Sequence, residues 1–308
     1  MTERRLEGVL AVDKPSGPTS HDVVGRARRA LGVRRVGHTG TLDPFATGLL
    51  LLCVGKATRL AEFLTDLDKS YDAEAVLGIS TDTLDRQGTV VAESEGWRDR
   101  TRADVEAALE GLRGPILQVP PQYSAKKVGG VAMHRRARRG ERVALEPRPV
   151  TVQELELVEV DLPRLRLRVR CSSGTYVRAL ARDLGETLGV GAHLAELRRT
   201  AVGGFRVEDA VALEELDAAG GGGDGVPGRA WHTPLEALAH LPSEEVSRER
   251  ARALAHGQVL PAEGEEDRGP VALSHGGVLV AVAEVVSGRL RPRKVFLSPS
   301  ALEPEGDA

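Results

Sequence analysis

Cysteine is scarce in this sequence, and long apolar runs are lacking. The two cysteines, Cys53 and Cys171, do not belong to a Cys-x-x-Cys pair, which excludes a disulfide framework. The longest strongly apolar run, Leu49–Val54, is far shorter than the roughly 20 residues that a helix needs to cross a bilayer. The first residues show no apolar segment typical of a signal peptide. We therefore expect a cytoplasmic protein in a reducing environment, without membrane association.

Motifs for several common chemistries are also missing. The eight histidines show neither HxxH nor HExxH spacing, so the sequence gives little support for a zinc site. Gly55 and Lys56 resemble the end of a phosphate-binding P-loop, but Leu50 stands where its first glycine belongs and Ala57 where its hydroxyl residue belongs. There is no GxSxG elbow. Hydrolase, kinase and metalloenzyme functions are thus poorly supported.

The chain is long enough for about two domains, and its composition is that of a globular protein. It has 308 residues, of which 41% are hydrophobic and 28% charged, with a formal net charge of −3. The charge is uneven: residues 26–35 contain five arginines and no acid, and residues 124–142 contain seven basic residues against Glu141. Such clusters can produce a local positive field, although a solvated helix face explains either of them equally well.

Apolar periodicity predicts alternating strands and helices. Strands are expected at 8–13, 49–54, 71–79 and 162–169, and the last of these alternates arginine with leucine or valine. Helices are expected from Thr19 or Ser20 to Leu31, from 101 to 112 and from 177 to 188. Residues 118–149 are rich in proline, glycine and arginine and indicate an excursion from the core. Short apolar runs in 247–299 predict a small C-terminal β-domain.

The loop Gly37–Gly48 is the strongest candidate for a functional segment. Its glycines allow tight backbone geometry, and Asp43 lies between Leu42 and Pro44. A carboxylate flanked in this way either forms an Asx-turn or is held for chemistry. On the residues alone, the turn-forming role is the simpler interpretation.

The same loop closely resembles the catalytic motif of the TruB family of tRNA pseudouridine synthases. Further segments resemble other motifs of that family and occur in its order, over most of residues 8–205: 13–17, 68–71 with Gly78, 120–127, 171–178 with 183–185, and 197–200. Its bacterial members, which act on uridine 55 of tRNA, are the best match. One departure is His134, where the family usually has an aromatic residue in its insertion.

The resemblance implies a fold and a domain organisation. We expect an α+β fold with a mixed, largely antiparallel sheet and flanking helices, followed by a small C-terminal β-barrel of the RNA-binding PUA type. The catalytic domain is expected to span residues 1–235, with the basic insertion at about 118–149, and the PUA-like domain residues 245–300.

The resemblance also assigns roles to individual residues. Asp43 is the essential carboxylate, Arg178 keeps it ionised, and Tyr71 stacks on the uracil and takes part in proton transfer. Leu197 lines the pocket behind the base, and His38 stacks in the RNA where the extruded base was. From the residues alone, Tyr71 and Leu197 are better explained as core side chains, whereas His38 is equally well explained as a polar loop residue.

RNA binding is assigned by the resemblance to the lysine of the N-terminal motif and to the basic insertion. The residues concerned are Lys14, Lys126, Lys127, Arg135, Arg136, Arg138 and Arg139. The expected partner is the T-arm stem-loop of tRNA, bound by a monomer without a guide RNA, a protein partner or a cofactor. Two alternatives are a tRNA-folding protein whose chemistry is incidental and a guide-RNA-dependent synthase.

Overall fold

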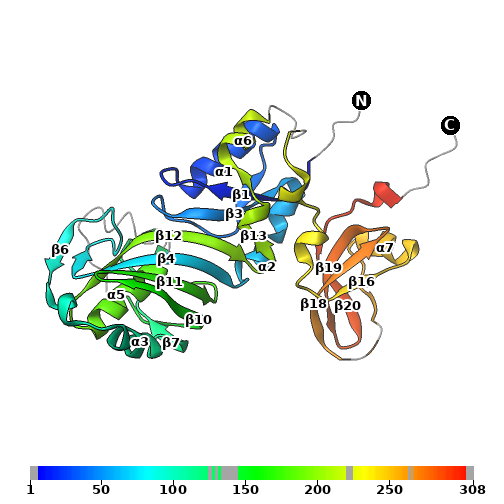
Figure 1. Cartoon of the computed structure of the whole chain (residues 1–308). Helices are drawn as coiled ribbons and strands as arrows, with labels where there is room; N and C mark the ends of the chain where they lie inside the picture. The colour runs from blue at the N-terminus through cyan, green and yellow to red at the C-terminus, as the bar shows by residue number, and fades with distance from the viewer. Residues whose placement is uncertain are drawn as a thin grey trace.

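The computed structural model describes residues 6–123, 127–128, 131–132, 145–219, 225–262, 264 and 266–302. A large mixed sheet with flanking helices forms most of the molecule, and a smaller sheet follows at the C-terminal end (Figure 1). The expected α+β class is thereby confirmed.

Eleven strands form the large sheet, and only two of its described pairings, β1 with β14 and β3 with β12, are parallel. In spatial order its main path is β14 (Val211–Ala212), β1 (Gly8–Lys14), β3 (Thr47–Val54), β12 (Ala192–Val202), β4 (Lys69–Leu77), β11 (Arg164–Cys171), β10 (Arg148–Asp161) and β7 (Gly114–Gln118). Three short strands pair beside this path: β2 (Val36–His38) with β3, β13 (Phe205–Arg206) with β12 and β15 (Trp231–His232) with β1.

Helices cover one face of this sheet. They are α1 (Ser20–Leu31) and α6 (Leu213–Ala218) beside β1, and α3 (Arg102–Glu110) and α5 (Val177–Thr187) beneath β4 and β11 (Figure 1). Their apolar sides share one core with the sheet, which includes Val24 of α1, Leu180 of α5 and Leu50 of β3. Burial of apolar surface at about 25 cal/mol per Å² makes such a core the main stabilising contribution.

The start and end of α1 follow directly from the sequence. Thr19 is the N-cap, and it forms a capping box in which its side chain accepts from the Asp22 N–H while the Asp22 carboxylate accepts from the Thr19 N–H. At the other end Gly32 adopts the left-handed conformation (φ 66°), which favours glycine. Both boundaries agree with the prediction.

The apolar run predicted at 49–54 is a strand that is buried on both faces. Leu50 and Leu52 of β3 face the helices, whereas Leu49 and Leu51 face a second core. That second core is formed with η1 (Gly55–Leu60), α2 (Ala61–Thr65) and residues of the C-terminal sheet. Burial on both sides explains why this strand shows no alternation.

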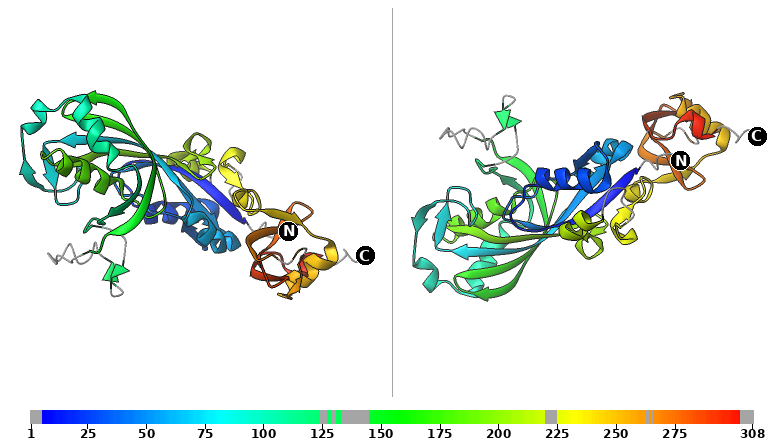
Figure 2. Two further views of the ribbon diagram at one scale, coloured as in Figure 1. Left: turned by 90° about the horizontal axis from the view of Figure 1, so that it is seen from below. Right: turned by 90° about the horizontal axis from the view of Figure 1, so that it is seen from above.

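The C-terminal sheet has five described strands and curls as a half-barrel, consistent with a PUA-like domain (Figure 2). Its order is β16 (Ser243–Glu245), β18 (Arg268–His275), β19 (Val278–Val286), β20 (Arg289–Val295) and β17 (Leu260–Pro261), and α7 (Arg248–Ala255) packs on it. Phe296 and Val282 belong to the core that also contains Leu51 of β3. The two sheets are therefore joined by apolar contact.

The remaining described elements are short. They are the hairpin of β5 (Ile79–Thr81) and β6 (Val90–Glu93), the two-residue strands β8 (Lys127–Val128) and β9 (Val131–Ala132), and the 3-10 turns η2 (Gly96–Asp99), η3 (Val207–Asp209), η4 (Gly228–Ala230), η5 (Glu236–Leu238) and η6 (Pro299–Leu302). Within the described residues, no helix is long and apolar enough to span a membrane.

The alternating arginines of β11 lie on the face of the large sheet that the helices leave uncovered. Arg164, Arg166, Arg168 and Arg170 are exposed, as the alternation predicts. Acidic side chains of β4 and β10 flank them, for example Glu156, whose Oε2 lies 2.8 Å from Arg168 Nη1. Because both neighbouring strands supply carboxylates, this row forms a network of ion pairs rather than an unpaired positive stripe.

Candidate active site

Asp43 lies in the loop between β2 and β3, and hydrogen bonds on both sides hold this part of the loop. Ser20 Oγ, at the start of α1, accepts from the N–H of Leu42 at 2.8 Å and lies 3.1 Å from its carbonyl oxygen. On the other side, the N–H of Gly17 donates to the carbonyl of Pro44 at 2.8 Å. The backbone at Asp43 is thus attached to α1 and to the turn that follows β1.

Arg178, in the first turn of α5, directs its guanidinium at Asp43. Its Nε lies 2.8 Å from Asp43 Oδ2, and its Nη2 donates to Oδ1 at 3.2 Å. Nη1 donates to the carbonyl of Thr83 at 2.6 Å and lies 3.3 Å from Asp85 Oδ2, while Nη2 also donates to the carbonyl of Tyr123 at 2.9 Å. With only 4% of its side chain exposed, Arg178 holds Asp43 through a two-point contact of fixed orientation.

The position of α5 depends on a buried amide. The N-cap residue of α5, Tyr176, provides no side-chain cap. Instead, the Gln118 side chain accepts from the Tyr176 N–H at 2.8 Å and donates to the Tyr176 carbonyl at 3.2 Å. This contact ties the start of the helix, and with it Arg178, to the end of β7.

Opposing effects act on the ionisation of Asp43. Burial raises the pKa of Asp43 above its ordinary value, the positive charge of Arg178 lowers it, and the negative charge of Asp85 raises it. The carboxylate keeps 33% of its side-chain surface exposed. Arg178 therefore stabilises the ionised form against the effect of burial, and the raised pKa makes the carboxylate a stronger base and nucleophile than a free aspartate.

These contacts bear on the turn-forming interpretation of Asp43. The described hydrogen bonds of its carboxylate come from Arg178 on α5 rather than from its own loop. A carboxylate held by a distant helix suits a chemical role better than a local turn.

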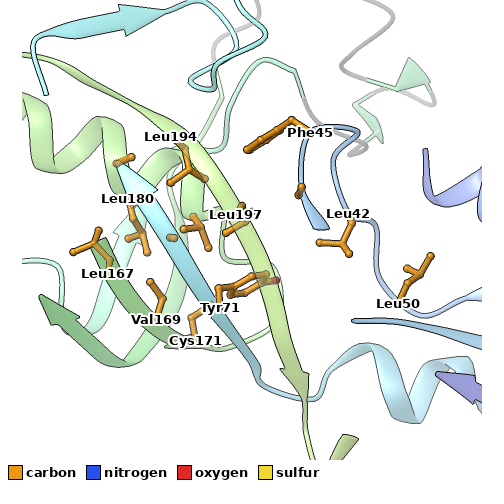
Figure 3. Close-up of a cluster of buried hydrophobic side chains, with 14 of the residues drawn as sticks. Leu42, Phe45, Leu50, Tyr71, Leu167, Val169, Cys171, Leu180, Leu194 and Leu197 are labelled. Atoms are coloured by element: carbon orange, nitrogen blue, oxygen red, sulfur yellow. The ribbon is translucent and has the colours of Figure 1, made fainter. Parts of the chain in front are cut away.

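Asp43 and Arg178 open onto a pocket of about 420 Å³ that Tyr71 and Leu197 also line. Tyr71 lies on β4 and Leu197 on β12, and Figure 3 shows both side chains together on the side facing Leu42. The structure therefore brings four sequence-predicted site residues to one cavity. Burial raises the pKa of Tyr71, which favours the protonated hydroxyl.

A second hollow, of about 630 Å³, lies along the charged face of the sheet and shares Leu197 with the first. Its lining includes Arg86 and Arg198 together with Glu74 and Glu196, but not Asp43, Tyr71 or Arg178. Although this hollow is larger, the smaller pocket contains Asp43, Tyr71 and Arg178. We therefore take the smaller pocket as the candidate active site.

Sequence reasoning missed three buried polar residues around this pocket. They are Asp85 beside Arg178, Lys69 at the start of β4 and Arg199 on β12. The Nζ of Lys69 donates to the carbonyl of Thr65, and burial lowers the pKa of Lys69 to about 8. Lys69 and Arg199 belong to recognised motif segments, which was an available signal, whereas Asp85 had no sequence signal of its own.

The structure buries the side chain of Lys14 completely. Its Nζ donates to the carbonyl of Pro15 at 2.8 Å and to that of Pro44 at 3.4 Å. Burial lowers the pKa of Lys14 from 10.5 to about 8. Lys14 thus supports the Asp43 loop, and its expected part in binding RNA or substrate stays a prediction.

His38 ends β2 and does not line the pocket. Burial and the nearby charge of Arg199 lower the pKa of His38, which favours the neutral imidazole. Within the described part of the chain its Nδ1 has no hydrogen-bond partner. Its expected stacking in the RNA stays a prediction.

Within the basic segment 124–142, the structure describes only the backbone of β8 and β9. Lys127 begins β8, while the other expected RNA contacts of the insertion, like His134, lie outside the described residues: Lys126, Arg135, Arg136, Arg138 and Arg139. In the ranges that the structure describes, no group of three or more His, Cys, Asp or Glu residues is arranged to hold a metal ion.

The sequence matches known protein families and curated proteins. Residues 28–177 match the N-terminal domain of the TruB family of pseudouridylate synthases, and residues 178–222 match the C-terminal domain of tRNA pseudouridylate synthase B. The chain is 44% identical to tRNA pseudouridine synthase B of Geobacillus thermodenitrificans over 94% of this chain and 100% of that protein. It is 47% identical to the protein of the same name from Thermobifida fusca, over 94% of this chain and 98% of that protein.

Chains in solved structures of two protein complexes are also similar to this chain. A chain in the crystal structure of a Cbf5-Nop10-Gar1 complex superposes with a TM-score of 0.74 at 28% identity, over 96% of this chain and 87% of that chain. A chain in the archaeal box H/ACA sRNP Nop10-Cbf5 complex gives a TM-score of 0.71 at 26% identity, over 97% of this chain and 89% of that chain. From its matched domains and its identity to curated relatives along nearly its whole length, this chain belongs to the TruB family of pseudouridylate synthases.

Proposed function

We propose that this protein converts uridine 55 in the T loop of tRNA to pseudouridine. The observation that carries the proposal is the pair of Asp43 and Arg178 at the mouth of a pocket that also contains Tyr71 and Leu197. Support for tRNA as the substrate comes from relatives named tRNA pseudouridine synthase B. The finer assignment to uridine 55 rests on the motif resemblance.

The reaction detaches uracil from C1′ of the ribose and rejoins it through C5, without net oxidation or group transfer. Asp43 has three possible roles: addition to C6 of the uracil, attack on C1′, or removal of a 2′ proton. Each of them needs an ionised carboxylate at the nucleoside, and Arg178 favours that form. No external cofactor has to enter the balance of this reaction.

The pocket supports distinct tasks for its other residues. Tyr71 offers a flat ring for stacking on the uracil and a hydroxyl that can take part in proton transfer from C5. Leu197 supplies an apolar wall and excludes water, which strengthens the electrostatic contacts of Asp43. The target nucleotide must leave the RNA stack to reach Asp43, at a cost of a few kcal/mol.

We propose that RNA contacts outside the pocket offset the free-energy cost of moving the target nucleotide out of the RNA stack. His38 fills the place of the extruded base, and the basic insertion binds phosphates of the stem-loop through Lys126, Lys127, Arg135, Arg136, Arg138 and Arg139. Residues 1–235 form the catalytic domain, with residues 245–300 as a PUA-like RNA-binding domain. The protein acts in the cytoplasm, as a monomer and without a guide RNA.

Bare T-arm transcript tests the proposed target and the independence from a guide. The protein is incubated with a stem-loop transcript alone, and pseudouridine is mapped along it. We expect modification at position 55 and none when that uridine is replaced by cytidine. Modification elsewhere contradicts the assignment to uridine 55, whereas activity that appears only with added guide RNA supports the alternative of a guide-RNA-dependent synthase.

A further inference from the structure

Arg199 of β12 is an almost fully buried arginine whose described hydrogen bonds all go to main-chain carbonyls. It is 2% exposed. Its Nε donates to the carbonyl of Leu49 at 2.7 Å, its Nη2 to that of Gly40 at 3.2 Å and its Nη1 to that of Thr41 at 3.5 Å. Two of these carbonyls belong to the loop that carries Asp43. A single planar guanidinium thus joins the loop to the start of β3.

Among the residues that the structure describes, no carboxylate forms a salt bridge with Arg199. A buried guanidinium is costly unless its charge is compensated, and neutral carbonyls compensate it less than a carboxylate does. Yet Arg199 lines the pocket that contains Asp43. This uncompensated charge is therefore directed at the place where the nucleoside is expected to react.

The register of the sheet places Arg199 between two parts of the site. Arg199 lies opposite Tyr71 in the antiparallel pairing of β12 with β4, and opposite Gly48 in the parallel pairing with β3. A Cβ atom at Gly48 would lie 2.3 Å from the Arg199 carbonyl oxygen, so only glycine permits this approach. The close pairing brings the end of the Asp43 loop against the strand that carries Arg199.

Arg199 also acts on the phenol of Tyr71. Burial raises the pKa of the Tyr71 hydroxyl, and the positive charge of the neighbouring Arg199 opposes this effect. Cross-strand neighbours on one face of a sheet lie close enough for such an interaction. Arg199 therefore lies opposite the residue that carries the phenol, and its guanidinium holds the segment that presents the carboxylate.

We propose that Arg199 is a positioning residue for the isomerisation, which holds the Tyr71 hydroxyl and the Asp43 loop in a fixed mutual arrangement. This inference rests on the proposed function. Arg199 does not need to touch the RNA, since it acts through Tyr71 and the carbonyls of Gly40 and Thr41. Lysine cannot replace it fully, because an ammonium group lacks the planar fork that reaches several acceptors at once.

A double-mutant cycle with Tyr71 tests this role. Arg199→Gln is expected to lower kcat about 100-fold with KM changed less than about threefold, because the lost contacts position groups without binding RNA. In a Tyr71→Phe background the same substitution is expected to cost at least about tenfold less, since interacting residues are not additive. Arg199→Lys is expected to restore part of kcat. Rates are measured under single turnover on the T-arm transcript, at temperatures where each variant is folded.

Arg198 provides the matched control, because it is the same residue type one position earlier and pairs with Asp13 at the surface. Arg198→Gln is expected to keep kcat within about threefold. If Arg199→Gln does not fold, Arg199→Lys serves in the same cycle. Equal losses from the Arg199 substitution in both backgrounds, or a rise in KM at unchanged kcat, overturn the inference.

A measurement without RNA separates this inference from the proposed function. The ¹³Cζ resonance of Tyr71, identified by its loss in Tyr71→Phe, is expected to move in Arg199→Gln and to stay in Arg198→Gln. An inactive wild-type protein in which this shift is present contradicts the proposed function but not the contact. Absence of the shift contradicts the positioning role whatever the activity.

Discussion

Replacing Asp85 with asparagine separates two effects that this buried carboxylate has on Asp43. Asp85 Oδ2 lies 3.3 Å from Arg178 Nη1, and Oδ1 accepts hydrogen bonds from Thr83 Oγ1 at 2.7 Å and from the N–H of Gln87 at 3.0 Å. Asparagine can keep the hydrogen bonds to Oδ1 but removes the charge. Arg178 then loses one of its two anionic partners.

The expected magnitude follows from this geometry. At 3.3 Å and an effective dielectric constant of about 20, the attraction between Asp85 and Arg178 is about 5 kcal/mol. Desolvation of both groups offsets much of it, and Asp43 still pairs with Arg178 after the change. We therefore expect Asp85→Asn to lower the free energy of unfolding by about 1–3 kcal/mol. Looser orientation of Arg178 is expected to lower kcat about 10- to 100-fold.

The pH dependence of the rate in Asp85→Asn distinguishes the effect of the Asp85 charge from its effect on the position of Arg178. The negative charge of Asp85 raises the pKa of Asp43, so its removal lowers that pKa. Because the proposed reaction needs the ionised carboxylate of Asp43, the acidic limb of the rate profile is expected to move to lower pH in Asp85→Asn, even though the plateau falls. Release of the C5 hydrogen from labelled uridine measures both quantities. A limb that moves to higher pH refutes this reasoning, as does a plateau equal to that of the wild type.

Three further predictions concern residues around the same loop and the junction of the two sheets. Arg178→Met removes the charge that lowers the pKa of Asp43, so the acidic limb is expected to move to higher pH, opposite to Asp85→Asn; an unmoved limb contradicts this. Burial lowers the pKa of Lys14 from 10.5 to about 8, so between these pH values the unfolded state binds a proton that the folded state does not. As pH rises from 8 to 10.5, the free energy of unfolding of the wild type is therefore expected to increase by up to about 3 kcal/mol relative to that of Lys14→Met, measured by denaturant unfolding. A difference that stays constant over this range contradicts the prediction. Glu62 pairs with Arg293 and Lys294 at a partly exposed position, so Glu62→Gln is expected to lower the free energy of unfolding by under about 1 kcal/mol. Phe296→Ala, in the core that the two sheets share, is expected to lower it by about 3 kcal/mol. Equal losses, measured by calorimetry, contradict an apolar junction between the sheets.

Local structure was predictable where a few neighbouring residues determine it. The helix α1 begins at the Thr19 capping box and ends at Gly32 because both signals are local in the chain. The alternation in β11 predicted its exposed and buried faces. By contrast, the bounds of β20, Arg289–Val295, were not predicted, since charged residues on its exposed side hide the apolar pattern.

The polar surroundings of the pocket were not predictable, because they arise from contacts between distant segments. Arg199 meets Gly48 only after β12 and β3 pair in parallel. Asp85 reaches Arg178 although 93 positions separate them in the numbering of the chain. Nothing in the sequence indicated that the fold buries Lys14 completely. Motif resemblance identified Asp43 and Arg178, and only the structure showed how they are oriented.

The most direct test compares isomerisation and RNA binding in Asp43→Asn. Asparagine has nearly the same shape and keeps a partner for Arg178, but it cannot supply a carboxylate to the nucleoside. We predict that Asp43→Asn forms no detectable pseudouridine in the T-arm transcript, while its affinity for the transcript stays within about threefold of the wild type. Turnover close to that of the wild type would contradict the central claim that this one carboxylate, held by Arg178, carries the reaction.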